Sequence, residues 1–510
     1  MERIPVVKNT LTNYVIMFVQ LLQGVFVTRY MVKYLPTEEY GMWSLMWSFF
    51  VYTFLLDFGL GITVQKYTST QLYKKDLEQY NAMMSSIFTY FLYAGLIIIG
   101  FTFVIMWLLP QLAKNVNMSR LGYYRQCLFF FGLGTAGVVP TTIFPGILLG
   151  INKIYIRNYI NIASRIIQLF ANIILLVSHF ELLSIVICNM SISIMTNLAM
   201  AVAIFHFISG FRLRLKIDFK ACRSMLNFSL IMYVILIINL LLDKGTYLLL
   251  SAFTGLTSVA NFHLGGRLPD LVRQASSAFQ ENMNQASAAM HAQGEHETLS
   301  RLLLNGMRMN SFIACCFGII GYALVPEALF ILFKVVDPDV MRICKVIMLT
   351  TVSQVALCNI PRTFMTMAER HRQLAIYRGV ELVLQLGVSI LLLLLTDYDV
   401  LGIVWTILIV KTCVGLHILG YQVCRYIQHS LVSVIWKVHC LPLLATILPV
   451  LSIVVLRQML FGDKPLVLFL VGGSVAALLY LVICYGLLLN HEERGLAISK
   501  VTDFMKKIKH

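Results

Sequence analysis

Long apolar runs recur along the whole chain and are separated by short polar segments. Each run is close to the length of about 20 residues that an α-helix needs to cross the hydrocarbon core of a bilayer. The predicted fold is therefore an all-α polytopic membrane protein. The connections between the runs are short throughout and could hold no separate domain, so the helix bundle itself is expected to carry the function. About fourteen spans are predicted, at residues 11–32, 41–65, 83–109, 122–150, 159–178, 182–208, 223–250, 266–290, 299–324, 342–368, 377–396, 400–423, 438–459 and 465–489.

The segment from Arg267 to Met290 has the length of a span but carries many polar side chains. At about 100° per residue, its apolar residues fall on one stripe and its polar residues on the opposite one. One interpretation is an interfacial amphipathic helix or a soluble loop. The other is a transmembrane helix that lines a wet cavity, because a lipid-facing helix could not carry so many polar groups.

Composition supports a membrane protein, since 59% of the residues are hydrophobic and only 13% are charged. The net charge of +16 would also fit a nucleic-acid partner. However, the Lys and Arg residues cluster in short loops, which is typical of orientation signals. We therefore predict no nucleic-acid partner.

The charge bias decides between the two interpretations of Arg267 to Met290. If this segment spans the membrane, the later inside segments hold eleven basic residues and the outside segments hold two. If it does not span, the bias inverts, against the positive-inside rule. The sequence therefore favours fourteen spans with both termini cytoplasmic. The inside residues are Arg301, Arg370, Arg372, Arg378, Arg425, Lys437, Arg494, Lys500, Lys506, Lys507 and Lys509, and the outside residues are Lys334 and Lys464.

The eleven cysteines lie mostly within or beside apolar runs and show no metal-ligand spacing. They are therefore interpreted as small packing residues, and neither a metal nor a cofactor is predicted. The N-terminal residues MERIPVVK lead into the first span without a small-residue cleavage site. No removable signal peptide is expected.

A weak internal repeat divides the chain. At an offset of about 219 residues, Tyr14–Ile16 matches Tyr233–Ile235 and Gln20 matches Asn239. This repeat predicts two six-helix lobes at residues 1–210 and 211–425, followed by two extra helices and a basic cytoplasmic tail at residues 426–510. Parallel halves of this kind build a transporter with its binding site between them.

The N-terminal region also carries a family resemblance. It resembles the oligosaccharide flippases of the multidrug/oligosaccharidyl-lipid/polysaccharide exporter (MOP) superfamily. The resemblance rests on Asn13, Gln20, Gln23, Arg29-Tyr30, the segment LPTEEYGMWSL and the segment LLDFGLGITVQKYTS, which contains Asp57, Gly59 and Gly61.

The resemblance implies a multi-pass protein of the bacterial inner membrane and no enzymatic activity. Such a protein would move undecaprenyl-pyrophosphate-linked oligosaccharide units from the cytoplasmic to the periplasmic leaflet by alternating access. These units feed O-antigen, capsule or exopolysaccharide assembly, so membrane lipids and polysaccharide polymerase machinery are the implied partners. Related members export drugs or flip the peptidoglycan precursor, so the superfamily alone does not fix the substrate.

A pyrophosphate group needs cationic partners in a wet cavity. The candidates are Arg273 and Arg267 on the polar helix, Lys244 in the seventh span and Arg29 in the first. Each has a structural alternative: Arg273 can pair with Asp270 within the helix, and Arg267 can extend toward lipid head groups.

Uncharged polar groups would bind sugar hydroxyls, with interhelical hydrogen bonding as the alternative. Intramembrane acids would bind H⁺ or Na⁺ in an antiport cycle, or simply neutralise nearby cations. Asp57 aligns with Ser277 in the repeat, which predicts that the two face one cavity. The uncharged candidates are Asn13, Gln20, Asn239, Gln274, Ser277 and Asn284, and the acids are Asp57, Asp243, Asp270 and Glu281.

Eight further charged residues in or near spans receive no role because the sequence does not show which way they face. They are Arg125, Arg165, Arg308, Arg342, Arg362, Glu381, Lys411 and Arg457. Two other functions stay open: a drug or cation antiporter of the same superfamily, and an enzyme such as a membrane polysaccharide polymerase or acyltransferase. The antiporter would need a smaller, more acidic and aromatic site, and the polymerase a large outside loop.

Overall fold

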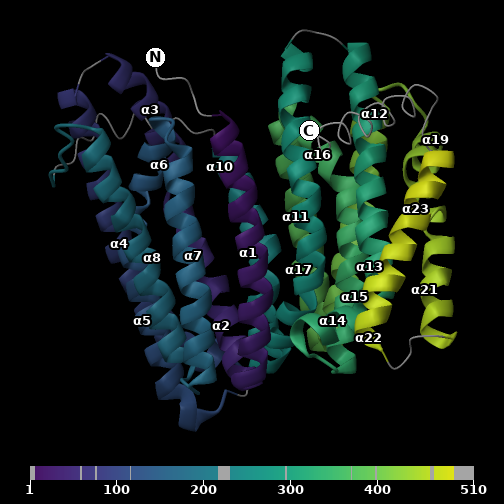
Figure 1. The fold of residues 1–510 in the computed structure, drawn as a ribbon, viewed down its shortest axis with the longest axis horizontal. Coiled ribbons are helices and arrows are strands. Elements are labelled where there is room, and N and C mark those ends of the chain that lie inside the picture. The colour runs from purple at the N-terminus through teal and green to yellow at the C-terminus, as the bar shows by residue number, and fades with distance from the viewer. Residues whose placement is uncertain are drawn as a thin grey trace, which may run out of the picture. The chain divides into compact units, whose positions relative to one another are not determined.

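The structure, a computed structural model, describes residues 6–57, 60–74, 77–114, 116–215, 230–292, 296–368, 370–396, 399–459 and 464–487. Throughout these ranges the ordered elements are helices and none is a strand, which confirms the all-α fold (Figure 1). Twelve of the described helices are long and apolar enough to cross a membrane, so the chain is a multi-pass membrane protein.

These twelve helices coincide with twelve of the predicted spans. The two remaining predicted spans are not among these twelve helices: the first falls on three short helical segments of 14, 7 and 15 residues, and the second lies in a long helix that carries many polar residues. Residues 41–65 fall on α2, the 3-10 segment η1 and α3, and residues 266–290 fall within α11. The total of fourteen spans and the cytoplasmic placement of both termini stay predictions.

The chain forms two compact units. Unit 1 comprises Met1–His263 and Leu393–Val400. This division does not test the two six-helix lobes inferred from the repeat, which stay a prediction. The elements of unit 1 are α1 (Val6–Tyr34), α2 (Thr37–Phe50), η1 (Val51–Asp57), α3 (Leu60–Lys74), α4 (Leu77–Leu112), η2 (Met118–Arg120), α5 (Leu121–Thr141), α6 (Ile143–Gly150), α7 (Ile154–Val177), α8 (Leu182–Phe207), α10 (Leu230–Phe253) and the start of α11 (Leu256–Ala292).

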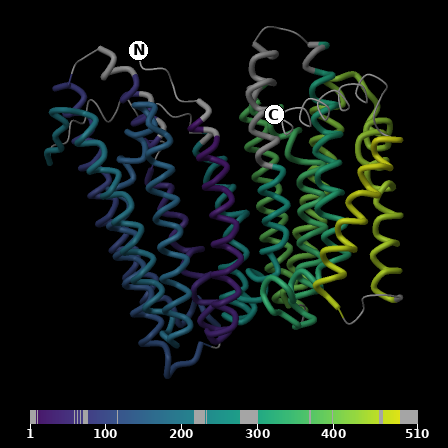
Figure 2. The backbone as a smooth tube through the Cα atoms, in the orientation of Figure 1, coloured from purple at the N-terminus to yellow at the C-terminus, as the bar shows by residue number. Residues whose placement is uncertain are grey.

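Unit 2 comprises Leu264–Leu392 and Leu401–His510. Short π-helical segments, η3 to η7, interrupt its helices, and its last two long helices, α21 and α23, pack against each other (yellow in Figure 2). After α11, its elements are α12 (His296–Ile313), η3 (Ala314–Ile319), α13 (Ile320–Ala323), α14 (Val325–Phe333), α15 (Pro338–Ser353), η4 (Gln354–Cys358), α16 (Asn359–Met367), α17 (His371–Leu395), α18 (Val400–Ile418), η5 (Leu419–Cys424), α19 (Leu431–Val434), η6 (Ile435–Cys440), α20 (Leu441–Leu444), α21 (Ile447–Met459), α22 (Pro465–Val467), η7 (Leu468–Gly472) and α23 (Gly473–Leu487).

Helix α11 belongs to both units. It is a single helix of 37 residues, about 55 Å long at 1.5 Å per residue, and its residues up to His263 lie in unit 1. These first turns pack on α2, where Ser44 hydrogen-bonds the His263 ring and Tyr40 stacks 5.3 Å from it. The approach is close because Gly41 faces the backbone of Leu256.

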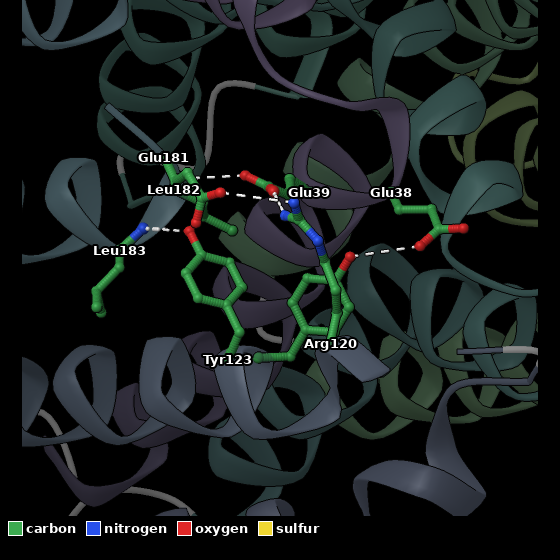
Figure 3. A network of polar contacts seen from close by, with 8 residues as sticks. Glu38, Glu39, Arg120, Tyr123, Glu181, Leu182 and Leu183 are labelled. Atoms are coloured by element: carbon green, nitrogen blue, oxygen red, sulfur yellow. Dashed lines mark hydrogen bonds and ion pairs between the residues drawn. The ribbon is translucent and has the colours of Figure 1, made fainter. Parts of the chain in front are cut away.

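A polar network joins α2, η2, α5 and the start of α8 in unit 1 (Figure 3). Glu39 is only 1% exposed and forms an ion pair with Arg120, while its other carboxylate oxygen accepts the backbone N–H of Leu182 at the start of α8. The Tyr123 hydroxyl accepts the N–H of Leu183 at 3.0 Å. One carboxylate thus ties α2 to η2 and to the first turn of α8, where helix N–H groups lack internal partners.

The close approach of α2 and α11 predicts the effect of one methyl group. A Cβ on Gly41 would overlap the carbonyl oxygen of Leu256, so Gly41→Ala should lower the free energy of unfolding by about 1–3 kcal/mol. Thermal unfolding of the purified chain in detergent measures this effect. The control is Gly24→Ala on α1, where a Cβ would meet nothing within 4 Å; equal melting temperatures for both variants would contradict the packing argument.

Glu39 lies ahead of the predicted second span and is expected to make stability depend on pH. Burial raises the pKa of its carboxyl above the usual 4.5, although the Leu182 N–H and Arg120 act in the opposite direction. Between the unfolded and folded pKa values the folded chain therefore binds more protons than the unfolded chain. It follows that the free energy of unfolding falls as pH rises from 4.5 through the folded pKa.

The test is the melting temperature of each variant minus that of wild type, measured at several pH values between pH 4 and pH 8. The Glu39→Gln variant should lack this part of the pH dependence, whereas a change at the exposed Glu78, Glu78→Gln, should keep it. Identical pH profiles for wild type and Glu39→Gln would show that the carboxyl titrates alike in both states.

Candidate functional site

A line of polar side chains follows one face of α7. Their spacings are three, four, three and four residues, which keeps them on one face of a helix with 3.6 residues per turn. We call this set the α7 stripe; its members are Asn158, Asn161, Arg165, Gln168 and Asn172. The stripe lies within a helix that packs against α1 and α8 (Figure 1).

Both ends of the α7 stripe are held by neutral hydrogen bonds. The fully buried Asn158 donates to Thr12 Oγ1 at 3.0 Å and to Asn13 Oδ1 at 2.6 Å on α1. Asn172 and Asn189 of α8 exchange two amide hydrogen bonds of 2.8 and 3.3 Å. Polar groups paired in this way join helices in membrane bundles, so these contacts are structural.

Arg165 differs because it is a cation in the middle of the stripe. It is the twelfth residue of the 24-residue candidate span Ile154–Val177, so it lies near mid-membrane depth. Its Nη1 donates to Gln23 Oε1 at 3.0 Å, and Gln23 Nε2 donates to Gln168 Oε1 at 3.0 Å. Among the described residues, no acidic side chain forms an ion pair with Arg165.

The energetics of Arg165 indicate a further partner. An arginine at the centre of a span costs about 2.5–3.5 kcal/mol on insertion scales, whereas a hydrogen bond between transmembrane helices contributes about 0.6 kcal/mol on average. The amide of Gln23 therefore does not offset the charge. Contact with water or with an anionic ligand would supply the difference.

A second charged cluster lies inside unit 2. Glu381 is fully buried, and its Oε2 accepts hydrogen bonds from Arg362 at 2.8 Å and Arg378 at 2.6 Å. On α18, Lys411 donates to Gln354 Oε1 of the π-helical segment η4 at 3.0 Å. The arrangement joins α16 to α17 through one carboxylate and α18 to η4 through one ammonium group.

A chain of small polar groups adds to the interior of unit 2. Ser276 donates to Asn310 Oδ1 at 2.9 Å, Asn310 Nδ2 donates to the carbonyl oxygen of Val355 at 2.7 Å, and Asn359 Nδ2 donates to Ser276 Oγ at 3.4 Å. These contacts hold α11, α12 and α16 together.

The predicted binding residues of unit 1 differ in their exposure and in their contacts. Asn13 is joined to Asn158 as described, and Gln20 and Asp243 are exposed. Arg29 and Asn239 are partly exposed. The ammonium of Lys244 lies 5.1 Å from the ring centre of Tyr247. Asp57 is partly exposed and accepts the backbone N–H of Gly61 at 3.2 Å, so it caps the start of α3.

In unit 2, Arg273 forms an ion pair with Asp270, which is the structural alternative that the sequence left open. Arg267 is partly buried and Gln274 is exposed. The side chains of Ser277, Glu281 and Asn284 lie outside the described part of the structure. Substrate contact by any of these residues stays a prediction.

The α7 stripe is the feature that the sequence analysis missed. Arg165 received no role there, and Gln168 was not considered. The spacing of three and four residues across Asn158 to Asn172 was the available signal, since it separates a polar face from an apolar one. It was overlooked because α7 is mostly apolar and only one face is polar.

The model of the family described as "Polysaccharide biosynthesis protein" matches residues 30–334, more than half of the chain. No curated protein matches the sequence. The solved structure of the lipid II flippase MurJ in an inward closed conformation is similar, with a TM-score of 0.70 and 14% identity over 92% of this chain and 97% of that chain.

Two transporters share the same architecture. An inward-facing multidrug resistance MATE family transporter of the MOP superfamily gives a TM-score of 0.65 at 14% identity, over 81% of this chain and 94% of that one. A MOP superfamily transporter from Pyrococcus furiosus gives 0.53 at 13% identity, over 83% and 96%. At these identities the similarity establishes the fold. The chain therefore belongs to the family of polysaccharide biosynthesis proteins and has the fold of MOP-superfamily transporters.

Proposed function

We propose that this protein is a flippase for lipid-linked oligosaccharides in the bacterial inner membrane. It would move polyprenyl-pyrophosphate-linked sugar units from the cytoplasmic to the periplasmic leaflet by alternating access, and these units would feed the assembly of a cell-surface polysaccharide. The family places the chain in polysaccharide biosynthesis. The fold is similar to that of MurJ, which is named as a lipid II flippase.

The observation that carries the proposal is Arg165 in the middle of its span. A pyrophosphate group is strongly hydrated and cannot cross the hydrocarbon core without polar partners. A mid-membrane guanidinium that no described acid neutralises suits such a group, because charge-assisted hydrogen bonds to phosphate are about twice as strong as neutral ones. Neutral sugars alone would not require this cation.

The membrane potential supports outward movement without an obligatory coupling ion. An inside-negative potential favours the outward transfer of each negative charge by about 2.3 kcal/mol per 100 mV. If H⁺ or Na⁺ is coupled, the predicted binding residues are Asp57, Asp243, Asp270 and Glu281. Asp57 and Asp270 already have partners in Gly61 and Arg273, so Asp243, which is exposed, is the first to test.

The alternative is a multidrug antiporter, since a MATE transporter shares the fold. Arg165, in the middle of α7, would repel a cationic drug. The charge of this residue therefore favours an anionic head group over a cationic drug.

Reconstitution of the full-length chain in proteoliposomes tests the proposed function. A fluorescent oligosaccharide linked to polyprenyl pyrophosphate should become accessible in the opposite leaflet much faster with the protein than in empty liposomes. A lipophilic fluorescent cation, measured in the same vesicles, should not be moved. Transport of the cation without movement of the lipid-linked sugar would overturn the proposal in favour of the antiporter.

A further inference from the structure

Helix α7 carries a second arginine, Arg157, eight residues before Arg165. The guanidinium of Arg157 donates through Nε and Nη2 to Asn158 Oδ1, at 3.3 and 3.0 Å. As with Arg165, none of the described acidic side chains forms an ion pair with it. The two arginines therefore share one arrangement: each is partly buried and is held by the amide oxygen of a neutral side chain.

The remaining donors of both guanidinium groups are accessible. In Arg165, Nε and Nη2 donate to no described residue, and in Arg157 the same holds for Nη1. None of these nitrogens is among the enclosed polar atoms that lack a partner. Each arginine thus keeps at least one N–H group that a ligand can reach.

The spacing of the two arginines relates them to depth in the membrane. Eight residues correspond to about 12 Å along a helix axis, and the two positions differ by about 80° around the helix. Arg157 is the fourth residue of the candidate span and Arg165 the twelfth. On the predicted topology, α7 begins at the cytoplasmic side, so Arg157 lies near the inner leaflet surface and Arg165 near the middle.

The neighbours of α7 support a route between these depths. On α1, Asn13 contacts Asn158, which in turn accepts from Arg157, and Gln23 accepts directly from Arg165. Helix α1 therefore lies beside both arginines of α7. On the same two helices, the side chains of Phe18, Ile166 and Phe170 are large, apolar and exposed. Helices that expose both apolar side chains and a cation fit a lipid whose phosphate meets the arginine while its chain stays in hydrocarbon.

We infer that Arg157 and Arg165 form two successive binding positions for the phosphate group of a membrane lipid on the α1–α7 face of unit 1. The identification of this lipid as the polyprenyl pyrophosphate that carries the sugar unit rests on the proposed function. The phosphate would bind first at Arg157, near the cytoplasmic surface, and then at Arg165 in mid-membrane. An ordinary phospholipid has the same phosphate chemistry, so the test separates the two sources.

Binding to the full-length chain in nanodiscs provides the test. Polyprenyl diphosphate without sugar, the neutral polyprenol and phosphatidylglycerol are compared by native mass spectrometry. Wild type should bind the diphosphate at least about tenfold more tightly than the polyprenol. Arg157→Gln and Arg165→Gln should each weaken diphosphate binding by about tenfold or more, because each removes charge-assisted hydrogen bonds, and should leave polyprenol binding unchanged.

Two variants control for folding and for charge. Arg125→Gln alters an arginine of unit 1 whose Nε already donates to the carbonyl oxygen of Met106 at 3.1 Å, and it should bind like wild type. Arg165→Lys keeps the charge but loses the planar fork of donors, so it should recover part of the lost affinity. A glutamine variant that also loses polyprenol binding has lost its fold. In that case the result for Arg165→Lys is used instead, and wild-type diphosphate binding by that variant would count against a role for the donor geometry of Arg165.

Wild-type diphosphate binding by either glutamine variant would overturn the inference of two positions. Equal affinity for phosphatidylglycerol, lost in the same variants, would support the phosphate site and assign it to a phospholipid. A wild-type chain that binds the diphosphate at these arginines but does not flip the lipid-linked oligosaccharide would contradict the proposed function and leave the phosphate site standing.

Discussion

Hydrocarbon offers no hydrogen bonds, and this constraint determines where the polar side chains of the spans lie. Every amide or charge within a span must find a partner in the protein, in water or in a ligand. The amides of Asn158 and Asn172 meet this demand through α1 and α8. Their contacts fix the helices around Arg165 at the depth where a charge is most expensive.

The two units meet the demand for charged groups in different ways. In unit 2, Glu381 gathers two guanidinium groups, so that charge is balanced within the protein and serves to hold α16 and α17 together. In unit 1, Arg165 donates to the oxygen of Gln23, and no acidic side chain of the described residues forms an ion pair with it. A paired cation stabilises a bundle, whereas the proposed function assigns the cation held by a neutral amide to a mobile anion.

Sequence reasoning predicted the helical spans because apolar length is a local property, and twelve of the predicted regions coincide with candidate spans. It also offered the pairing of Arg273 with Asp270 as one of two alternatives, since three residues on a helix bring two side chains together without any tertiary contact. The contact between Gln23 and Arg165 could not be read in this way. Its partners are 142 residues apart, and only the packing of α1 on α7 joins them.

The passage of α11 from one unit to the other has a mechanical consequence. Just beyond His263, where the helix changes unit, it carries Gly265, Gly266 and then Pro269, whose missing N–H removes the hydrogen bond to the carbonyl of Gly265. The backbone of α11 therefore lacks one helical hydrogen bond close to this junction. A bend of about 10° there would displace the far end of the remaining helix by about 6 Å, so a small change at this point of α11 becomes a large one at its C-terminal end.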